Sequence, residues 1–336
     1  MNEREPESQS GEDRLIARYF RPLATHPGAR ALIDDAATFT PPAGVDIVLT
    51  TDALVGGVHF FADDPPDTIA KKALRVNLSD LAAKGAQPAG FLLSLALPAG
   101  IGEEWLEAFA RGLGADAQAY GCALLGGDTV RTTGPVTLSI TAFGTLPRDT
   151  MVGRSGARAG DLVVVTGTIG DAALGLLVRR DPEIAERWQL DPAQRDHLIE
   201  RYLLPQPRNA VAEALRQHAS AAMDVSDGLA GDLGKLCAAS NVAADVGIAR
   251  VPLSDASSQA IATDPALMET ALTGGDDYEV VATVPAEARD ALMADAKAAG
   301  VALTEIGIIR ADRPGMHFLD QVGKPLLFKK PSFSHF

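Results

Sequence analysis

Apolar and polar residues alternate with two different periods along this chain, and the two periods predict a mixed α/β protein. Where apolar side chains recur every three or four residues, we predict helices over residues 13–20, 68–84, 103–120, 171–180, 192–203, 207–218 and 228–239. Where β-branched and apolar residues form short runs or alternate with polar ones, we predict strands over residues 46–51, 91–97, 136–144, 161–166, 278–284 and 305–310. Helices and strands interleave, so the expected fold class is α/β with α+β character.

A stretch rich in glycine and arginine, GRSGARAGD at residues 153–161, interrupts this pattern and indicates a linker or turn between two units. The length of 336 residues also suits about two domains of ordinary size. We therefore predict an N-terminal domain over residues 12–150 and a C-terminal domain over residues 151–336. Residues 1–11 are polar and charged, and we predict that they are disordered.

The formal net charge of −14 argues against partners that bind a basic surface. Nucleic acids and anionic membrane surfaces both attract clusters of Lys and Arg. No apolar run is long enough to cross a bilayer, and the N-terminus has no signal-peptide pattern. The two cysteines, Cys122 and Cys237, form neither a disulfide framework nor a zinc-ligand pattern, so a cytoplasmic protein is expected.

The most informative polar residues are aspartates that lie beside Gly, Ser or Thr in turn-like or strand-end settings. Several follow apolar runs, as in VLTTD (48–52), ALLGGD (123–128) and AAMDVSDG (221–228). A carboxylate at the end of a buried strand faces the crevice in which α/β proteins bind ligands. Mg²⁺ prefers oxygen ligands and takes some of them from substrate phosphates, so the set predicts a magnesium site that bridges phosphates. The set comprises Asp34, Asp35, Asp52, Asp80, Asp128, Asp224, Asp227, Asp276 and Asp277.

Each of these aspartates also has a structural explanation when it is taken alone. Asp80 lies four residues before Lys84, so the two could form an ion pair on a helix. Asp224 and Asp227 could cap a helix and form a turn, and the acids at 276–277 could complete a plain turn. Caps and turns do not require so many acids at strand ends, so the set as a whole favours the metal site.

Several common catalytic motifs are absent from the sequence. It contains no GxxxxGK[ST] phosphate loop, no protein-kinase signature, and no GxSxG or HExxH motif. GTIGD (167–171) predicts a strand-to-helix turn, with phosphate binding at the helix start as a second interpretation.

Taken in order, the motifs resemble those of the thiamine-monophosphate kinase family, which is part of the superfamily of aminoimidazole ribonucleotide synthetase. The resemblance rests on IDDAA (33–37), TTDALVGGVHF (50–60), NLSDLAAKGAQP (77–88), GGDT (126–129), GRSGA (153–157), VTGTIGD (165–171), DVSDGL (224–229), GGDDYE (274–279) and SHF (334–336). It implies an N-terminal α/β domain that forms a homodimer, a C-terminal α/β domain, and an active site in the cleft between the domains. It also implies ATP-dependent phosphorylation of thiamine monophosphate to thiamine diphosphate.

The resemblance assigns roles to residues by their place in these motifs. The ligands of several Mg²⁺ ions would be Asp35, Thr50, Thr51, Asp52, Asp80, Asp128, Asp224 and Asp227. ATP would be bound by Gly127, Asp128, Arg154 and Ser226, and thiamine monophosphate by His59, Asp276 and Phe333. Two positions depart from the family pattern, because Ile33 replaces the usual glycine before the double acid and Asp276 replaces the usual glutamate.

The expected chemistry needs no strong general base. The second pKa of a phosphate monoester is about 6, so the attacking phosphate oxygen is already largely ionised at neutral pH. Two polyanions repel each other, by roughly 4 kcal/mol for each pair of unit charges 4 Å apart at an effective dielectric constant of 20. Mg²⁺ held by Asp52, Asp128 and Asp224 would cancel this charge together with Arg154, which allows direct in-line transfer.

Two other interpretations remain open on the sequence. The chain could be another ATP-using member of the superfamily, of the aminoimidazole ribonucleotide synthetase or selenophosphate synthetase type. Selenophosphate synthetases usually carry a reactive cysteine or selenocysteine near the N-terminus, and no cysteine precedes Cys122 here. The chain could also be a non-catalytic regulator that binds Mg²⁺ and a nucleotide, because the same aspartates would serve it.

Overall fold

The computed structural model describes residues 11–312, 315–326, 328 and 332. The chain divides into two compact units: unit 1 comprises Met1–Asn77 and Pro88–Thr145, and unit 2 comprises Leu78–Gln87 and Leu146–Phe336. The predicted division between residues 150 and 151 stays a prediction. Residues 1–10 of the predicted disordered segment lie outside the described residues, as does Phe333, and Gly11 begins the first helix.

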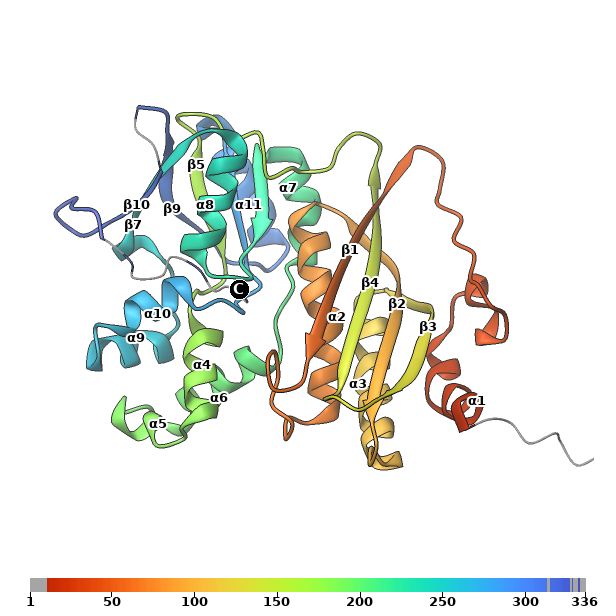
Figure 1. Cartoon of the computed structure of the whole chain (residues 1–336). Helices are drawn as coiled ribbons and strands as arrows, with labels where there is room; N and C mark the ends of the chain where they lie inside the picture. The colour runs from red at the N-terminus through yellow and green to blue at the C-terminus, as the bar shows by residue number, and fades with distance from the viewer. Residues whose placement is uncertain (1–10, 313–314, 327, 329–331, 333–336) are drawn as a thin grey trace, which may run out of the picture. The chain divides into compact units, whose positions relative to one another are not determined.

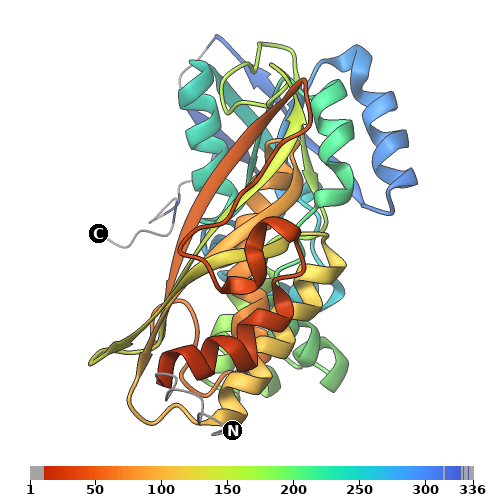
Figure 2. The ribbon, with the colours of Figure 1, turned by 90° about the vertical axis from the view of Figure 1, so that its right-hand side faces the viewer.

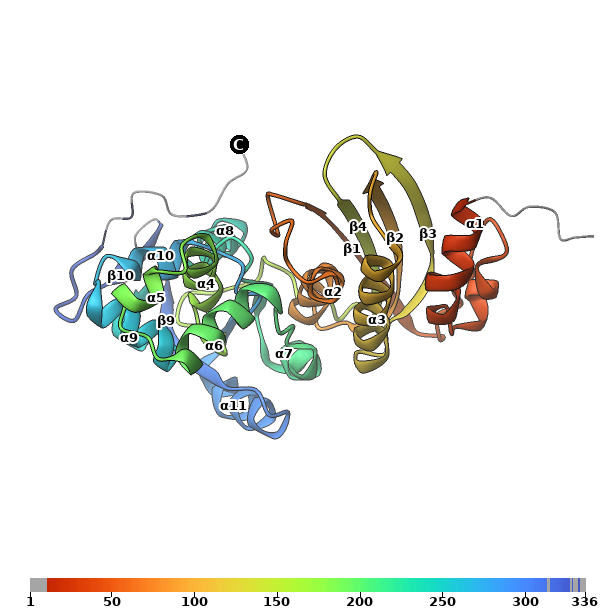
Figure 3. The same cartoon turned by 90° about the horizontal axis from the view of Figure 1, so that it is seen from below.

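Unit 1 is built on a four-stranded sheet with the strand order β1-β4-β2-β3. Its strands are β1 (Val45–Val55), β2 (Gln87–Pro98), β3 (Ala123–Thr132) and β4 (Thr137–Pro147). Helices α2 (Pro66–Ala83) and α3 (Glu103–Ala119) lie on one face of this sheet, and α1 (Gly11–Leu15) lies near its β3 edge (Figure 1, Figure 3). The last turns of α2, from Leu78 onward, belong to unit 2.

Side chains alternate between the two faces of β1, which runs as one long strand (Figure 2). Val48 and Leu54 are buried on one face, whereas Ile47 and Leu49 are exposed on the other. The core on the helix side of the sheet includes Phe109 of α3, which is fully buried. The other face of the sheet therefore keeps apolar side chains in contact with solvent.

Unit 2 is built on a six-stranded mixed sheet with the strand order β10-β7-β9-β5-β8-β6. The strands are β5 (Leu162–Thr166), β6 (Ala221–Asp224), β7 (Ala243–Gly247), β8 (Val280–Val284), β9 (Leu303–Arg310) and β10 (Met316–Leu319). β10 and β7 are parallel, and the other neighbouring strands are antiparallel.

Helices pack on both faces of this second sheet because its central strands are apolar on both sides. Val163 of β5 and Leu233 of α8 share one core, whereas Val164 of β5 shares a second core with Leu215 of α7 and Leu292 of α11. The helices of unit 2 are α4 (Asp171–Arg180), α5 (Ile184–Arg187), α6 (Pro192–Leu203), α7 (Ala212–His218), α8 (Leu229–Ser240), α9 (Asp255–Thr263), α10 (Leu267–Thr273) and α11 (Arg289–Ala298).

The predicted mixed α/β fold is confirmed by these two sheets and their helices. The helix predicted over residues 13–20 is α1 followed by a π-helical turn, and the helix predicted over residues 207–218 is a 3₁₀ turn followed by α7. In the described part of the chain, no helix combines the length and the apolar character that a membrane span requires.

Candidate functional site

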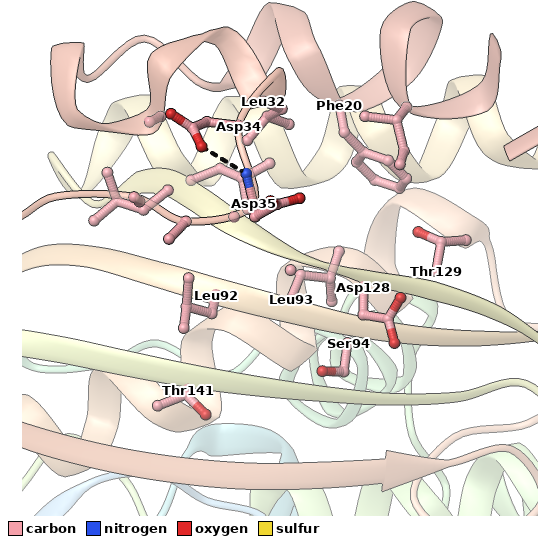
Figure 4. Close-up of a pocket in the computed structure, with 18 residues that line it drawn as sticks. Phe20, Leu32, Asp34, Asp35, Leu92, Leu93, Ser94, Asp128, Thr129 and Thr141 are labelled. Carbon is pink, nitrogen blue, oxygen red and sulfur yellow. Dashed lines mark hydrogen bonds between the residues drawn. The ribbon is translucent and has the colours of Figure 1, made fainter. Parts of the chain in front are cut away.

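A cavity of about 740 Å³ lies in unit 1, between the sheet and the segment that precedes β1 (Figure 4). Asp34 and Asp35 line it from the loop before β1, and Gly127 and Asp128 line it from β3. The cavity wall thus contains three carboxylates, and none of its described lining residues is basic. Such a wall repels a bare phosphate and suits a divalent cation or a phosphate that carries one.

The backbone at both sides of this cavity adopts conformations that most residues avoid. Gly127 has a φ of 155°, and a Cβ atom at this position would lie 1.9 Å from the carbonyl oxygen of Leu93 on the neighbouring strand. Only glycine fits there, so β3 can approach β2 closely just before Asp128. On the other side, Arg30, Ala31 and Leu32 all have positive φ values of 49°, 53° and 51°. Strained backbone of this kind concentrates at functional sites.

The predicted metal ligands of β1 divide between the two faces of the sheet. Thr51 lies on the exposed face, where its Oγ1 is 3.1 Å from that of Thr141, a residue of the cavity wall. Thr50 and Asp52 point to the opposite face, because neighbouring residues of a strand alternate. The Asp52 N–H donates to Oδ1 of Asn77 in α2 at 3.1 Å. The three side chains therefore do not meet at one point.

Two aspartates are not at the strand ends that the sequence pattern indicated. Asp52 and Asp128 lie inside β1 and β3. The strand-end prediction was wrong for both because each strand continues past the acid. Asp80 lies inside α2, as the helix predicted over residues 68–84 requires.

The predicted substrate residue His59 lies in the turn after β1. Its Nδ1 accepts a hydrogen bond from the N–H of Val55 at 3.0 Å, so a neutral ring carries its proton on Nε2. This bond fixes the orientation of the ring.

In unit 2, the DVSDG segment follows β6 and precedes α8. Asp224 is the last residue of β6 and is buried at 4% exposure, while Ser226 and Asp227 are partly exposed in the turn. The Asp227 carboxylate pairs with Lys235 at 2.5 Å, and Lys235 also contacts the buried Asp232 at 2.8 Å. A metal ion at Asp227 would therefore compete with a resident ammonium group.

The GGDDYE segment pairs directly with this turn through its backbone. The Asp276 N–H donates to the carbonyl oxygen of Ser226, and the Tyr278 N–H donates to that of Val225, both at 2.8 Å. Asp276 and Tyr278 have positive φ values of 66° and 50°, which non-glycine residues seldom adopt. The predicted ATP-binding residue Ser226 and the predicted substrate residue Asp276 are thus direct neighbours.

A buried glutamate, which sequence reasoning did not single out, holds the base of this loop. Glu279 has no exposed surface and accepts hydrogen bonds from Thr166 at 2.7 Å, Arg201 at 2.7 Å and Arg208 at 2.6 Å. The neighbouring Gly167 must lack a side chain, because a Cβ atom there would lie 2.2 Å from Glu279 Oε1. The only sequence signal for this cluster is an acid next to an apolar strand, VVATV.

The GTIGD turn between β5 and α4 is occupied by an internal carboxylate. The Gly170 N–H donates to both Asp277 carboxylate oxygens, at 3.0 and 2.9 Å. Burial raises the pKa of Asp277 well above its usual range, and this amide is its main counteracting partner. The geometry supports the interpretation of this segment as a structural turn rather than a phosphate loop.

Arg154 and Asp80 belong to the same unit and act on the same lysine. Asp80 lies in the last turns of α2, and Arg154 is exposed in the segment before β5. Burial lowers the pKa of Lys84 most, the charge of Arg154 lowers it further, and the charges of Asp224 and Asp80 raise it. The candidate site residues thus divide between the two units. Those of unit 2 are Asp80, Arg154, Asp224, Ser226, Asp227 and Asp276, and those of unit 1 are Asp35, Thr50, Thr51, Asp52, His59, Gly127 and Asp128.

Within the described residues, no group of three His, Cys, Asp or Glu side chains is close enough to hold a metal ion without other ligands. The donor atoms at hand are carboxylate and hydroxyl oxygens, which fit Mg²⁺ and not a softer metal.

Two family descriptions match the chain. Residues 33–146 match "AIR synthase related protein, N-terminal domain", and residues 158–318 match "AIR synthase related protein, C-terminal domain". All but two of the predicted site residues fall within one of these matches. Arg154 lies between the two matches, and Phe333 lies after the second.

Several known proteins are similar to this chain over most of their own length. A thiamine-monophosphate kinase of Caulobacter vibrioides is 43% identical over 87% of this chain and 82% of its own. The crystal structure of thiamine-monophosphate kinase from Stenotrophomonas maltophilia K279a is 41% identical, covers 94% of this chain and 96% of that chain, and has a TM-score of 0.81. The structure of "AaThiL complexed with AMPPCP and TMP" is 32% identical to this chain. The match covers 90% of this chain and 91% of that chain, with a TM-score of 0.74.

Proposed function

This chain belongs to the thiamine-monophosphate kinase family, and we propose from that membership that it phosphorylates thiamine monophosphate to thiamine diphosphate with ATP as the phosphate donor. A relative has been solved with AMPPCP and TMP bound, which supports both substrates. Within this structure, the main support is the backbone pairing of the DVSDG turn with the GGDDYE loop. It holds a candidate nucleotide-binding segment directly beside a candidate substrate-binding segment.

We assign the binding of Mg²⁺ to the acidic and hydroxyl side chains of both units. These residues are Asp35, Thr50, Thr51, Asp52, Asp80, Asp128, Asp224 and Asp227. Mg²⁺ would supply the positive charge that allows one phosphate to approach another. In support, the cavity of unit 1 has an acidic wall that holds Asp35 and Asp128. The catalytic contribution of Asp52, Asp128 and Asp224 is then to fix this charge where the transferred phosphoryl group lies.

The other assigned residues bind and orient the two substrates. Arg154 is exposed, and its guanidinium group can bind two phosphate oxygens of ATP at once. Gly127 lines the cavity of unit 1, where its backbone can contact a nucleotide, and Ser226 offers a hydroxyl group at the turn before α8. His59 and Asp276 are the described residues that we assign to thiamine monophosphate. No residue needs to act as a strong base, because the attacking phosphate is already ionised.

Product analysis tests this function directly. Purified protein is incubated with ATP, Mg²⁺ and thiamine monophosphate, and thiamine diphosphate is measured by chromatography. We expect one ADP for each thiamine diphosphate formed. ATP turnover with an aminoimidazole precursor or with selenide in place of thiamine monophosphate would assign the chain to another branch of the superfamily. Nucleotide binding without turnover of any acceptor would identify a regulator.

Arg154→Ala is expected to raise the KM for ATP roughly 10-fold, because a charge-assisted hydrogen bond contributes about 1.5–3 kcal/mol. The KM for thiamine monophosphate should change little. Steady-state kinetics with each substrate varied in turn measure both constants. Arg158→Ala, four residues further along the same segment, is the matched control. Unchanged ATP kinetics in Arg154→Ala would remove this residue from the nucleotide site.

We propose that the chain forms a homodimer through the uncovered face of the unit 1 sheet. Ile47, Leu49, Leu92 and Val130 are large apolar side chains exposed on its strands, and Leu49 is 68% exposed. Apolar patches of this kind on a sheet are typical of protein interfaces.

Leu49→Glu is expected to convert the dimer to a monomer, because each partner would have to bury a carboxylate in an apolar interface. Sedimentation velocity measures the mass of the particle. Val322→Glu places the same charge on an exposed apolar residue of unit 2 and should leave the dimer intact. A wild-type protein that sediments as a monomer would contradict the proposal.

We assign the chain to the cytoplasm, where ATP is supplied and thiols stay reduced. Both cysteines are buried and free, and burial raises the pKa of Cys122 to about 12. The net charge of −14 supports small-molecule partners rather than nucleic acid or a membrane surface.

A further inference from the structure

Lys84 is a partly buried lysine that no step described so far uses. It follows the last residue of α2 and precedes Gly85, where the chain turns toward β2. A lysine in such a position ordinarily extends its ammonium group into solvent, because removing that group from water is costly. Here the side chain turns inward, and Nζ donates to the carbonyl oxygen of Ala222 at 2.7 Å.

Two polar groups of Lys84 bind two other segments, its N–H continues the hydrogen bonds of α2, and each of the three segments carries a candidate site residue. Its N–H donates to the carbonyl oxygen of Asp80 at 3.0 Å. Its carbonyl oxygen accepts from the N–H of Val152 at 3.2 Å, two residues before Arg154. Its ammonium group binds Ala222, two residues before Asp224. Lys84 is therefore held at the junction of these three segments by its own backbone and side chain.

The segments are also bound to each other around this junction. The N–H of Ala222 donates to the carbonyl oxygen of Gly153 at 2.9 Å. The segment before Arg154 thus pairs with the strand that ends at Asp224, so the position of Nζ is fixed from both sides.

The electrostatic surroundings of the ammonium group consist of the same candidate residues. Burial and the positive charge of Arg154 lower the pKa of Lys84 to about 8, and the negative charges of Asp224 and Asp80 act in the opposite direction. The ammonium group held against Ala222 therefore places a positive charge between the segments that carry Asp80 and Asp224, before any metal ion or nucleotide binds.

We propose that Lys84 is a positioning residue of the phosphoryl-transfer site, a built-in cation that acts through Asp80, Asp224 and Arg154. This inference rests on the proposed function and adds a residue to it. A fixed positive charge repels an incoming divalent cation and attracts the phosphates of a nucleotide. Lys84 thereby favours the binding of metal together with nucleotide over the binding of metal alone.

Removal of the charge should therefore move two binding constants in opposite directions. In Lys84→Met, which keeps most of the side-chain volume, Mn²⁺ should bind more tightly without nucleotide, by roughly 10-fold at low salt. AMPPCP at saturating Mg²⁺ should bind more weakly by a similar factor. A merely structural role predicts that both ligands bind more weakly, because the segments would no longer be held in place.

The experiment measures free Mn²⁺ by electron paramagnetic resonance and AMPPCP binding by calorimetry, on the full chain at neutral pH. Lys84→Gln removes the charge but keeps an N–H donor for Ala222, so it should reproduce the result of Lys84→Met. Lys84→Arg keeps the charge and should restore wild-type values. Lys297→Met makes the same charge change on an exposed position of α11 and should alter neither constant.

The proposal would be overturned if both Mn²⁺ and AMPPCP bound more weakly to Lys84→Met and Lys84→Gln. It would also be overturned if these variants had the same two binding constants as Lys297→Met. If Lys84→Met does not fold, Lys84→Gln decides alone. The wild-type titrations separate this inference from the proposed function. A wild-type chain that binds neither Mn²⁺ nor AMPPCP contradicts the function itself, whereas wild-type binding with unshifted variants contradicts only the role of Lys84.

Discussion

Asp224→Asn is expected to lower kcat at least about 100-fold, the loss that follows removal of one preorganised electrostatic group from an active site. Asp224 is the last residue of β6 and is buried, so its negative charge lies at the end of that strand, next to the DVSDG turn. Asparagine keeps the shape of the side chain and removes the charge. The variant should need more Mg²⁺ for half-maximal rate and should keep a Tm close to that of the wild type, since burial of a neutral amide is less costly than burial of a carboxylate.

Rates measured over a series of Mg²⁺ concentrations test this result. Asp290→Asn, which makes the same change on the exposed surface of α11, should behave as wild type. Asp52→Asn should change the rate in the same direction, because we assign Mg²⁺ binding to this side chain too. Wild-type rates of Asp224→Asn or Asp52→Asn at low Mg²⁺ would remove that residue from the metal site.

Glu279→Gln is expected to reduce the free energy of unfolding by about 3–5 kcal/mol, the cost of leaving a buried charge without its partner. Glu279 is the shared counter-ion of Arg201 and Arg208, whose side chains are only 7% and 19% exposed. Glutamine has nearly the same volume, so the loss would arise from charge and not from a cavity. If Glu279→Gln folds, its KM for thiamine monophosphate should also be raised, because Glu279 holds the base of the loop that carries Asp276.

Urea denaturation followed by circular dichroism gives this free energy. Glu305→Gln is a matched control, because Glu305 also binds two arginines, Arg250 at 3.1 Å and Arg289 at 2.9 Å, on the surface of the unit. Surface ion pairs contribute little, so the midpoint should shift far less in the control. Equal shifts in the two variants would show that burial does not set the strength of the Glu279 cluster.

The sequence predicted the fold class well because its periodicity is strong in the long elements. α2 and α3 have apolar stripes, and the first half of β4 alternates, so their approximate positions followed from sequence. The short strands β6, β7 and β10 did not follow, because they lack the β-branched runs that marked the equally short β5 and β8. The longer β3 was not predicted either, because glycine and polar residues interrupt its apolar pattern.

Only part of the candidate site could be predicted from the sequence. The acids at 34–35, 128, 224 and 276 were found because glycine and small polar residues surround them. The secondary structure was harder to predict for Asp52 and Asp128, which lie inside strands rather than at their ends. Glu279 was part of the GGDDYE motif and Lys84 was considered as an ion-pair partner of Asp80, but neither was assigned its observed role, because partners such as Arg208 and Ala222 lie far away in the chain. No local pattern encodes such long-range contacts.

The most direct test of the account follows the γ-phosphate itself. Protein is mixed with Mg²⁺, thiamine monophosphate and ATP that carries a labelled γ-phosphate, and the label is traced in single-turnover samples. Direct transfer predicts that the label passes from ATP to thiamine diphosphate, with none bound to the protein at any time. Label that accumulates on the protein, or that is released only as inorganic phosphate, would contradict direct transfer between the two substrates.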